Sequence, residues 1–496
     1  MNTAIDWHAR AATLRITNQA FINGQYVAAL SGERFACVSP IDGRELAQVA
    51  ACETADVDEA VAAARRAFNQ GHWGNQSPQH RKRVLLKLAD LIELNGEELA
   101  LLETLDMGKP IRYALSVDVP ATARCVRWYA EAIDKLYDQV APTEPGVLAT
   151  ITREAIGVVG VVVPWNFPLI MAAWKFAPAL AAGNSVVLKP SEKSPLSAIR
   201  LAELVSEAGV PDGVFNVVPG LGHTAGKALA LHMDVDCIGF TGSTATGKLM
   251  MQYAGQSNLK RVWLECGGKS PNIIMPDVYD LDAAASAAAA GICFNQGEMC
   301  TAASRLLVHE SIKDEFVARV LAHAKDYQPA DPLLPETRLG AMVDAAHMQR
   351  VLSYVATGRG EGARINSGGE SVLMETGGSY VAPTVFDQVT PAMKIAQEEI
   401  FGPVLSVISF KDEAEALSIA NDVLYGLAAA VWTRDLNCAH RMAKALRAGM
   451  VYVNCYDEDD ITVPFGGYKQ SGNGRDKSLH AFDKYTELKT TWMRLG

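Results

Sequence analysis

Residues 158–189 read VVGVVVPWNFPLIMAAWKFAPALAAGNSVVLK. Two short apolar runs in this stretch, 158–163 and 185–188, flank a segment of helical length. Three more apolar runs follow, with helical patterns such as 197–208 between them, at 214–218, 236–240 and 261–264. Apolar strands that alternate with helices are typical of a parallel sheet covered on both faces. The sequence therefore predicts a doubly wound α/β domain that binds ligands at the carboxyl ends of its strands.

A second α/β pattern follows residue 265. It consists of a helix at 281–292, a strand at 305–309, a helix at 313–326, and strands at 404–410 and 449–454. Residues 147–156 and 484–493 read as extended strands outside both units, and exposed strands of this kind usually pair, often with another subunit. Helices dominate between about residue 56 and residue 136, and Asp56 with Glu59 matches a capping box at the start of the first.

The length and composition indicate an ordinary globular protein. The 496 residues are 49% apolar and 20% charged, and this length predicts roughly three structural units. The net charge of −11 argues against nucleic acid as the main partner, because phosphate backbones repel an acidic protein. Residues 1–10 carry no apolar core of a secretory signal, which predicts a cytoplasmic protein.

The cysteines and one uncharged stretch exclude further classes. Nine cysteines without any C-x-x-C pair fit neither a disulfide framework nor a zinc site, so we expect free thiols, one of them a candidate nucleophile. Residues 155–174 carry no charge over a length that would span a membrane. Pro164, Asn166 and Pro168 interrupt this stretch, which favours a buried strand and a turn instead.

A glycine-rich turn, FTGSTATGKL at 240–249, follows a predicted strand and opens a helix, where phosphate groups bind. Residues 242–248 match G-x-x-x-x-G-K, but Leu249 stands where a P-loop needs Ser or Thr for magnesium. A P-loop nucleotidase is therefore disfavoured. A turn that needs glycine for its geometry alone remains an alternative.

Cys300 lies in a polar loop, FNQGEMCTAASR at 294–305, between a helix and a strand. A single cysteine is more often a small buried apolar residue than a catalyst, so the prediction needs partners. Three strand ends supply them, at 164–168, 189–192 and 264–269, with an amide, a cation beside an anion, and a carboxylate. Their placement around one sheet predicts a shared site.

Six motifs together resemble the aldehyde dehydrogenase superfamily over about residues 20–490. They are PWNFP at 164–168, FTGSTATG at 240–247, LECGGK at 264–269, FNQGEMCTAASR at 294–305, EEIFGP at 398–403 and PFGGYK at 464–469. Within the superfamily, SGNGRDKSLH at 471–480 resembles the enzymes for ω-amino and ω-guanidino aldehydes, such as 4-guanidinobutyraldehyde and γ-glutamyl-γ-aminobutyraldehyde.

The resemblance implies roles for four catalytic residues. Cys300 is the nucleophile, Asn166 with the Cys300 N–H stabilises the oxyanion, and Glu265 activates the water that hydrolyses a thioester. The same base favours an acid-forming enzyme over one that acylates coenzyme A. Lys175 matches a lysine near the site, where proton handling and a buried structural ion pair are equally consistent.

The resemblance also implies a nicotinamide dinucleotide. Its expected contacts run from the adenosine ribose through the pyrophosphate to the nicotinamide: Lys189 and Glu192; Gly242 and Ser243; Glu399 and Phe401; and Trp165 and Phe240 beside the cofactor. A carboxylate at Glu192 repels a 2′-phosphate, which favours NAD over NADP, although Lys189 leaves use of both open. No metal is expected, because the thiol and the nicotinamide carry the redox step.

The resemblance implies a substrate tunnel with an aromatic wall and with the loop at 457–460 at its entrance. By resemblance, Phe167, Trp174 and Phe465 wall it beside Met299, and core packing is an equal alternative for each aromatic ring. Four consecutive acids at 457–460, including Asp457 and Asp459, precede Phe465. They form either a solvated loop or a surface that attracts a cationic substrate. Glu298 adds an acid near Cys300, and Asp476 stands where many relatives carry Glu.

These observations predict an NAD-dependent dehydrogenase that converts a cationic ω-amino or guanidino aldehyde into an acid. The alternatives are a generic aliphatic or succinate semialdehyde dehydrogenase, or a scaffold that binds NAD without turnover. The expected parts are an NAD-binding domain at 1–135 and 155–265, a catalytic domain at 266–482, and a small β oligomerisation arm at 136–154 and 483–496. By family likeness, the arm predicts a homotetramer built as a dimer of dimers.

Overall fold

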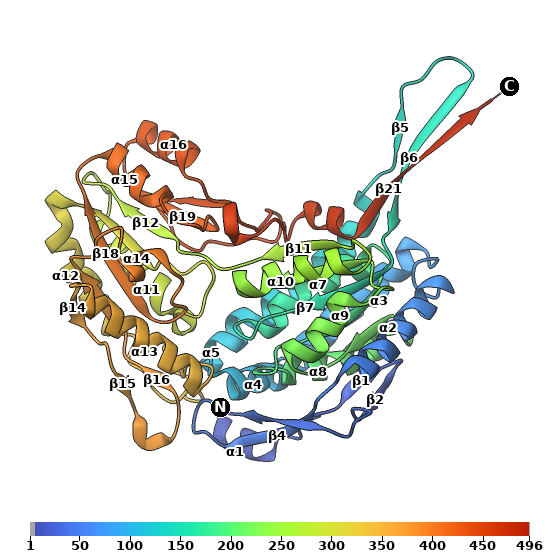
Figure 1. The fold of residues 1–496 in the computed structure, drawn as a ribbon, viewed down its shortest axis with the longest axis horizontal. Helices are drawn as coiled ribbons and strands as arrows, with labels where there is room; N and C mark the ends of the chain where they lie inside the picture. Colours follow the sequence, from blue (N-terminus) through green and yellow to red (C-terminus); the bar gives the residue numbers. More distant parts are fainter. Residues whose placement is uncertain (1–4, 496) are drawn as a thin grey trace.

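The first of two large sheets is the predicted doubly wound unit (Figure 1). The computed structural model describes residues 5–495, so residues 1–4 of the first ten and residue 496 of the predicted arm lie outside the description. The strand order is β11-β10-β7-β8-β9-β1-β2, and the five strands from β11 to β9 are parallel. The strands are β1 (Ala20–Ile22), β2 (Gln25–Val27), β7 (Val158–Val162), β8 (Ser185–Lys189), β9 (Phe215–Val217), β10 (Cys237–Thr241) and β11 (Arg261–Glu265).

Both faces of this sheet are buried, as its uninterrupted apolar runs predicted. Val158 and Val162 of β7 pack with one set of helices, and Val159 and Val161 pack with the other. The first set is α2 (Thr54–Asn69), α9 (Lys227–Leu231) and α10 (Thr244–Gln256). The second set is α3 (Pro78–Leu94), α4 (Gly96–Met107), α6 (Val119–Ala132), α7 (Pro168–Ala181) and α8 (Leu196–Ala208). Two short helices, α1 (Trp7–Thr13) and α5 (Ile111–Tyr113), lie between or before these elements.

The capping box predicted at Asp56 and Glu59 is wrong. Helix α2 begins at Thr54, and its box is formed by Glu53 and Asp56. The Asp56 carboxylate accepts the Glu53 N–H at 2.8 Å and the Leu30 N–H at 2.7 Å. Asp56 thus lies in the first turn of α2 rather than before it. Its two oxygens accept the N–H groups of the residue before the helix and of a distant segment.

The second large sheet confirms the second α/β pattern. Its order is β14-β17-β18-β13-β12-β19-β20, parallel except for β14. The strands are β12 (Pro271–Ile274), β13 (Arg305–His309), β14 (Arg364–Ser367), β17 (Thr384–Asp387), β18 (Val404–Phe410), β19 (Ala428–Trp432) and β20 (Met450–Val453). Its helices are α11 (Leu281–Cys293), α12 (Lys313–Ala324), α13 (Ala345–Gly360), α14 (Lys394–Gln397), α15 (Glu413–Asn421) and α16 (Leu436–Ala445). Two small hairpins pair β3 (Arg34–Val38) with β4 (Glu45–Ala50) and β15 (Ser371–Val372) with β16 (Tyr380–Val381).

A three-stranded arm projects from the body of the molecule (Figure 1). Strand β6 (Val147–Ala155) lies between β5 (Gln139–Ala141) and β21 (Thr486–Arg494), and both pairings are antiparallel. The two extended segments predicted from sequence thus pair with each other. Strand β21 begins later than expected because residues Leu479–Lys484 form a 3₁₀ helix, η8.

The uncharged stretch 155–174 is divided among β6, β7 and α7. Within residues 5–495, no helix is both long enough and apolar enough to cross a membrane.

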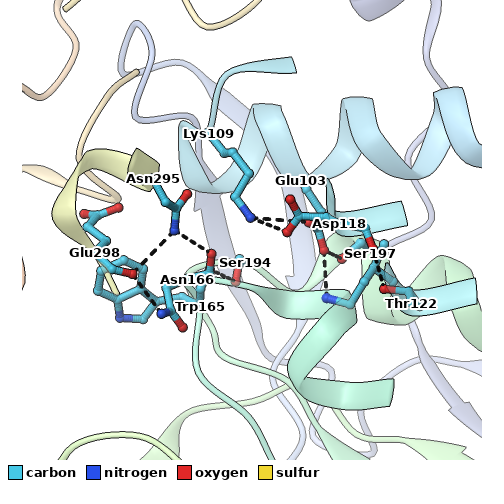
Figure 2. A network of polar contacts seen from close by, with 11 residues as sticks. Glu103, Lys109, Asp118, Thr122, Trp165, Asn166, Ser194, Ser197, Asn295 and Glu298 are labelled. Atoms are coloured by element: carbon cyan, nitrogen blue, oxygen red, sulfur yellow. Dashed lines mark hydrogen bonds and ion pairs between the residues drawn. The ribbon is translucent and has the colours of Figure 1, made fainter. Parts of the chain in front are cut away.

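The buried Glu103 carboxylate of α4 holds the helices that follow the site loops (Figure 2). Glu103 accepts the Leu169 N–H of α7 at 2.7 Å and the Ser197 hydroxyl of α8 at 3.3 Å. Lys109 lies 3.9 Å from Glu103 and also pairs with Asp118, and none of these three side chains reaches solvent. The buried Glu103 carboxylate therefore fixes the starts of α7 and α8, which follow the loops after β7 and β8.

We expect Glu103→Ala to lower the free energy of unfolding by about 3 kcal/mol, because the variant leaves a buried N–H and part of a buried cation unpaired. Urea unfolding followed by fluorescence measures the change. Glu97→Ala on the same helix is the control, since Glu97 pairs with Arg10 at the surface and its loss costs less than about 1 kcal/mol. Equal effects of the two variants would contradict the anchoring role.

Candidate active site

A cavity of about 910 Å³ lies at the carboxyl ends of β7, β8, β10 and β11, where the doubly wound topology places a ligand. Loops that precede β13 and β18 and follow β20 close its other side. This volume is typical of pockets that enclose a whole small-molecule ligand. The two sheets therefore share one site.

The nucleophile loop leaves α11 through a strained turn. Asn295, Gln296 and Gly297 have φ of +46°, +58° and +68°, so two residues other than glycine adopt the left-handed conformation in succession. Such strain persists only where the surroundings determine the backbone. Cys300 follows this turn, is partly exposed and lines the cavity. Burial raises the pKa of the Cys300 thiol, and the carboxylates of Glu399 and Glu265 raise it further, so the thiolate needs a base.

Asn166 is hydrogen-bonded to the nucleophile loop in both directions (Figure 2). Its Nδ2 donates to the Glu298 backbone carbonyl at 2.8 Å, and its backbone carbonyl accepts from Asn295 Nδ2 at 3.0 Å. A carboxamide nitrogen carries two hydrogens, so one remains to stabilise an oxyanion at the cavity wall. Asn166 lies where the sequence predicted.

Glu265 ends β11 and points away from the cavity. Its neighbours Cys266 and Gly267 line the cavity, whereas Glu265 is absent from the described lining, and a Cβ at Gly474 would lie 2.7 Å from its Oε1. Neither carboxylate oxygen has a hydrogen-bond partner among the described residues. Burial raises the pKa of Glu265 well above its usual value, with Asp476 adding to the effect. A raised pKa suits a base near neutral pH, but reaching the thioester requires a side-chain rotation.

Lys175 lies in a buried ion-pair cluster behind Glu265. Its Nζ is 2.9 Å from Asp476 Oδ2, and Lys484 pairs with the other oxygen of the same carboxylate. These contacts are those of the structural alternative that the sequence left open. Burial acts to raise the pKa of Asp476, but the two lysines outweigh it, so the net pKa is lowered.

All eight residues predicted for the cofactor line the cavity. Lys189 Nζ lies 2.9 Å from Glu192 Oε2, and Ser243 caps α10 by accepting the Thr246 N–H. A Cβ at Gly242 would approach the Phe240 ring to 2.6 Å, so only glycine fits there. Together, a helix N-terminus and a Lys–Glu pair suit the pyrophosphate and ribose of a dinucleotide.

The part of the cavity where the nicotinamide is expected is formed by Phe401, Trp165 and Glu399. Phe401 adopts φ of +64° and meets the edge of Trp165 at 5.2 Å between ring centroids. Glu399 Oε1 accepts the Gly268 N–H at 3.0 Å, and burial raises the pKa of Glu399 to about 7. These contacts place a ring pair and a titratable carboxyl group in the same cavity as Cys300.

Six of the seven residues predicted for the substrate line the cavity: Phe167, Trp174, Met299, Asp457, Asp459 and Phe465. The seventh, Glu298, differs from the expectation. Its carboxylate is fully buried and accepts the Val343 N–H at 3.0 Å, and burial raises its pKa well above the usual value. Glu298 contributes its backbone carbonyl, which holds Asn166, rather than an acid that faces substrate.

The acidic loop is divided between the cavity and solvent. Asp457 accepts the Thr301 hydroxyl at 3.0 Å, one residue from the nucleophile, and burial raises its pKa to about 6. Glu458 and Asp460 are exposed. The sequence could not separate these roles, because four consecutive acids carry no signal for the direction in which each one points.

Sequence reasoning missed Lys477 as a residue of the site. Its side chain is buried against the cavity, pairs with Asp459 and donates to the Asp460 carbonyl at 3.0 Å. Arg124 also lines the cavity and was not predicted. The only sequence signal for Lys477 was its place within the 471–480 motif. The polar residues of this motif follow neither a helical nor a strand period, so the sequence does not indicate which of them face the cavity.

A dinucleotide cleft that ends at a nucleophilic thiol is the arrangement of a nicotinamide-dependent oxidoreductase that works through a covalent intermediate. The chain belongs to the aldehyde dehydrogenase family, whose model matches residues 26–491. It is therefore an NAD(P)-dependent aldehyde dehydrogenase.

Similar proteins cover nearly the whole chain. The NADP/NAD-dependent aldehyde dehydrogenase PuuC of Escherichia coli (strain K12) is 56% identical over 489 residues, 99% of this chain and 98% of that protein. A crystal structure of γ-glutamyl-γ-aminobutyraldehyde dehydrogenase from Burkholderia cenocepacia J2315 is 62% identical, with a TM-score of 0.98 and 99% of each chain covered. A structure of the P. syringae indole-3-acetaldehyde dehydrogenase AldA, a mutant in complex with NAD+ and IAA, has the same identity, score and coverage.

We expect Gly268→Ala to lower kcat about 100-fold without unfolding the protein. A Cβ at Gly268 would lie 2.2 Å from the Cys300 carbonyl oxygen, so the nucleophile must move. Steady-state reduction of NAD with propionaldehyde measures the loss. Gly255→Ala is the control, since no atom lies within 4 Å of its added Cβ. A Gly268→Ala enzyme with unchanged kcat would show that the loop position is not critical.

Proposed function

We propose that this protein oxidises cationic ω-amino or guanidino aldehydes, such as 4-guanidinobutyraldehyde, to carboxylic acids with NAD. The observation that carries the substrate class is the partly buried Asp457 carboxylate, which lines the cavity and accepts the hydroxyl of Thr301, the residue after Cys300. A carboxylate that faces an ammonium or guanidinium at about 4 Å gains about 1 to 4 kcal/mol.

The proposed chemistry begins at the Cys300 sulfur. The deprotonated thiol forms a C–S bond with the aldehyde carbon, and the carbonyl electrons move to the oxygen, which Asn166 Nδ2 stabilises by a hydrogen bond. When bound, the nicotinamide accepts the hydride from this carbon, and a thioester remains on Cys300. Glu265, rotated toward the cavity, takes a proton from water. The water oxygen replaces the sulfur at the acyl carbon, which releases the acid and the free cysteine.

The charges at Lys189 and Glu192 support a preference for NAD. The Glu192 carboxylate, held 2.9 Å from Lys189, accepts a ribose hydroxyl and repels a 2′-phosphate. Lys189 supplies a cation for a phosphate, so we propose weaker use of NADP. The name of the similar PuuC protein, NADP/NAD-dependent, supports use of both.

Two relatives support different aldehydes. The 62% identical Burkholderia enzyme is named for an aminobutyraldehyde derivative, in agreement with a polar substrate. The equally similar P. syringae enzyme acts on indole-3-acetaldehyde, and Phe167, Trp174 and Phe465 give this cavity an aromatic wall. We therefore propose neutral arylacetaldehydes as a second substrate class. Succinate semialdehyde is disfavoured because Asp457 would repel its carboxylate.

We also propose that the protein is a cytoplasmic homotetramer, a dimer of dimers joined through the β5–β6–β21 arm. Val140, Leu488 and Trp492 are exposed on this arm, and apolar side chains on a projecting sheet suit a partner subunit. All nine cysteines are free thiols, which agrees with a reducing compartment.

The experiment that tests the function is NADH production from 4-guanidinobutyraldehyde, phenylacetaldehyde, propionaldehyde and succinate semialdehyde. We expect kcat/KM to be highest for the cationic aldehyde, and Asp457→Asn to lower that value about 10- to 100-fold while leaving propionaldehyde within threefold. Glu458→Gln, which removes an exposed acid of the same loop, is the matched control. Cys300→Ala must abolish every activity. A wild type without any advantage for the cationic aldehyde would refute the proposed substrate class.

The preference for a cationic aldehyde should depend on pH. The pKa of Asp457 is raised to about 6, so its carboxyl group is charged above that pH and neutral below it. We expect the ratio of kcat/KM for 4-guanidinobutyraldehyde to that for propionaldehyde to fall as pH drops from 7.5 to 5. Using a ratio cancels the titration of Cys300 and Glu265, which both substrates share. In Asp457→Asn the ratio should be low and flat, and a pH-dependent ratio in that variant would point to another group.

A further inference from the structure

The substrate end of the cavity holds two carboxylates with different partners. Asp457 accepts a neutral hydroxyl, that of Thr301, and has no ion pair within residues 5–495. Asp459 is already paired with Lys477. The side chain of Asp459 is 47% exposed, whereas Asp457 lies beside the nucleophile loop, so Asp457 is the inner acid and Asp459 the outer one.

Lys477 occupies a site built for an alkylammonium ion. Its Nζ lies 5.4 Å from the centre of the Trp174 ring and 5.6 Å from that of Phe465, two rings that are themselves 4.9 Å apart. Aromatic faces and a carboxylate are the groups by which proteins bind an ammonium ligand. Here the Asp459 carboxylate and the Asp460 carbonyl complete the shell.

The backbone keeps Lys477 in this position. Lys477 and Ser478 have φ of +59° and +50°, an unfavourable conformation for both residues, and the Ser478 N–H donates to the Ile461 carbonyl at 2.8 Å. Burial lowers the pKa of Lys477 to about 8, so the side chain is still charged at neutral pH.

We propose that Lys477 is a specificity-determining residue that fills the outer cation site of the substrate cavity, so that the enzyme accepts aldehydes with one cationic group and rejects those with two. This inference rests on the proposed function, because the inner site at Asp457 is the one that receives the substrate cation. A second ammonium group, three or four carbons beyond the first, meets Lys477 instead of a free carboxylate. Rejection by an internal like charge is a recognised route to specificity.

The test compares two aldehydes of polyamine type, 4-aminobutyraldehyde with one ammonium group and N-(3-aminopropyl)-4-aminobutyraldehyde with two. We expect wild type to favour the first by at least about tenfold in kcat/KM. Lys477→Met should lower the ratio of kcat/KM for the first aldehyde to that for the second at least tenfold, because it removes the cation from the outer site. Lys477→Arg keeps the cation and should keep the wild-type ratio. The double variant Lys477→Met with Asp459→Asn should lose the gain, since the emptied site no longer has its carboxylate.

Arg124→Gln is the matched control, because it removes the same charge from an exposed position of the same cavity. We expect it to change the ratio less than threefold. If Lys477→Met leaves the ratio unchanged, if the double variant keeps the gain, or if Arg124→Gln narrows the ratio equally, the proposal is wrong. A merely structural role for Lys477 would lower activity toward both aldehydes and leave their ratio constant.

Two further measurements separate other failures. Asp459→Asn alone changes a half-exposed side chain, so it folds even if Lys477→Met does not, and the unpaired Lys477 should then reject the dication at least threefold more strongly. An unchanged ratio in Asp459→Asn would also contradict the proposal. Failure of the proposed function looks different, since wild type would then show no preference for 4-aminobutyraldehyde over neutral butyraldehyde, whatever the Lys477 variants do.

Discussion

Asn166 joins the two halves of the molecule beside the proposed nucleophile, through its carboxamide and its backbone carbonyl. Asn166 follows strand β7 of the first sheet. Its Nδ2 donates to the Glu298 carbonyl, and its backbone carbonyl accepts from Asn295 Nδ2, both in the loop that leads into β13 of the second sheet. Buried amide hydrogen bonds of this kind are directional and costly to leave unmade. The separation between Asn166 and Cys300, the proposed oxyanion donor and the proposed nucleophile, is therefore set by two hydrogen bonds as well as by the packing of the two sheets.

The charges of the site are sorted by distance from the sulfur. Around Cys300 lie carboxyl groups with raised pKa values, Glu265 and Glu399, which burial keeps close to protonation. Farther out, Asp459 and Lys477 form a tight pair against aromatic rings. Carboxyl groups with raised pKa values thus lie near Cys300, and an ion pair lies where the rest of the substrate is proposed to pass.

Much of the fold could be predicted from the sequence, because the apolar runs that indicated strands are buried in the structure. The strands β13 and β18 match their predicted bounds at Arg305–His309 and Val404–Phe410, since uninterrupted apolar runs have no other stable environment. The site was harder. Cofactor residues were found because glycines and a helix start impose spacing, whereas Glu298 and Lys477 lie in segments without period. Whether Glu298 faces the substrate or Val343 depends on the left-handed turn at Asn295 and Gln296, which no single-residue propensity reveals.

The arm and the site share the end of the chain. Asp476, Lys477 and Lys484 lie within ten residues of the start of β21. Asp476 pairs with both Lys175 and Lys484, and Lys477 reaches into the substrate cavity. The segment 476–484 therefore connects the arm to the ion pairs of Asp476 and to the substrate end of the cavity, so a displacement of β21 acts on both through one short stretch of chain.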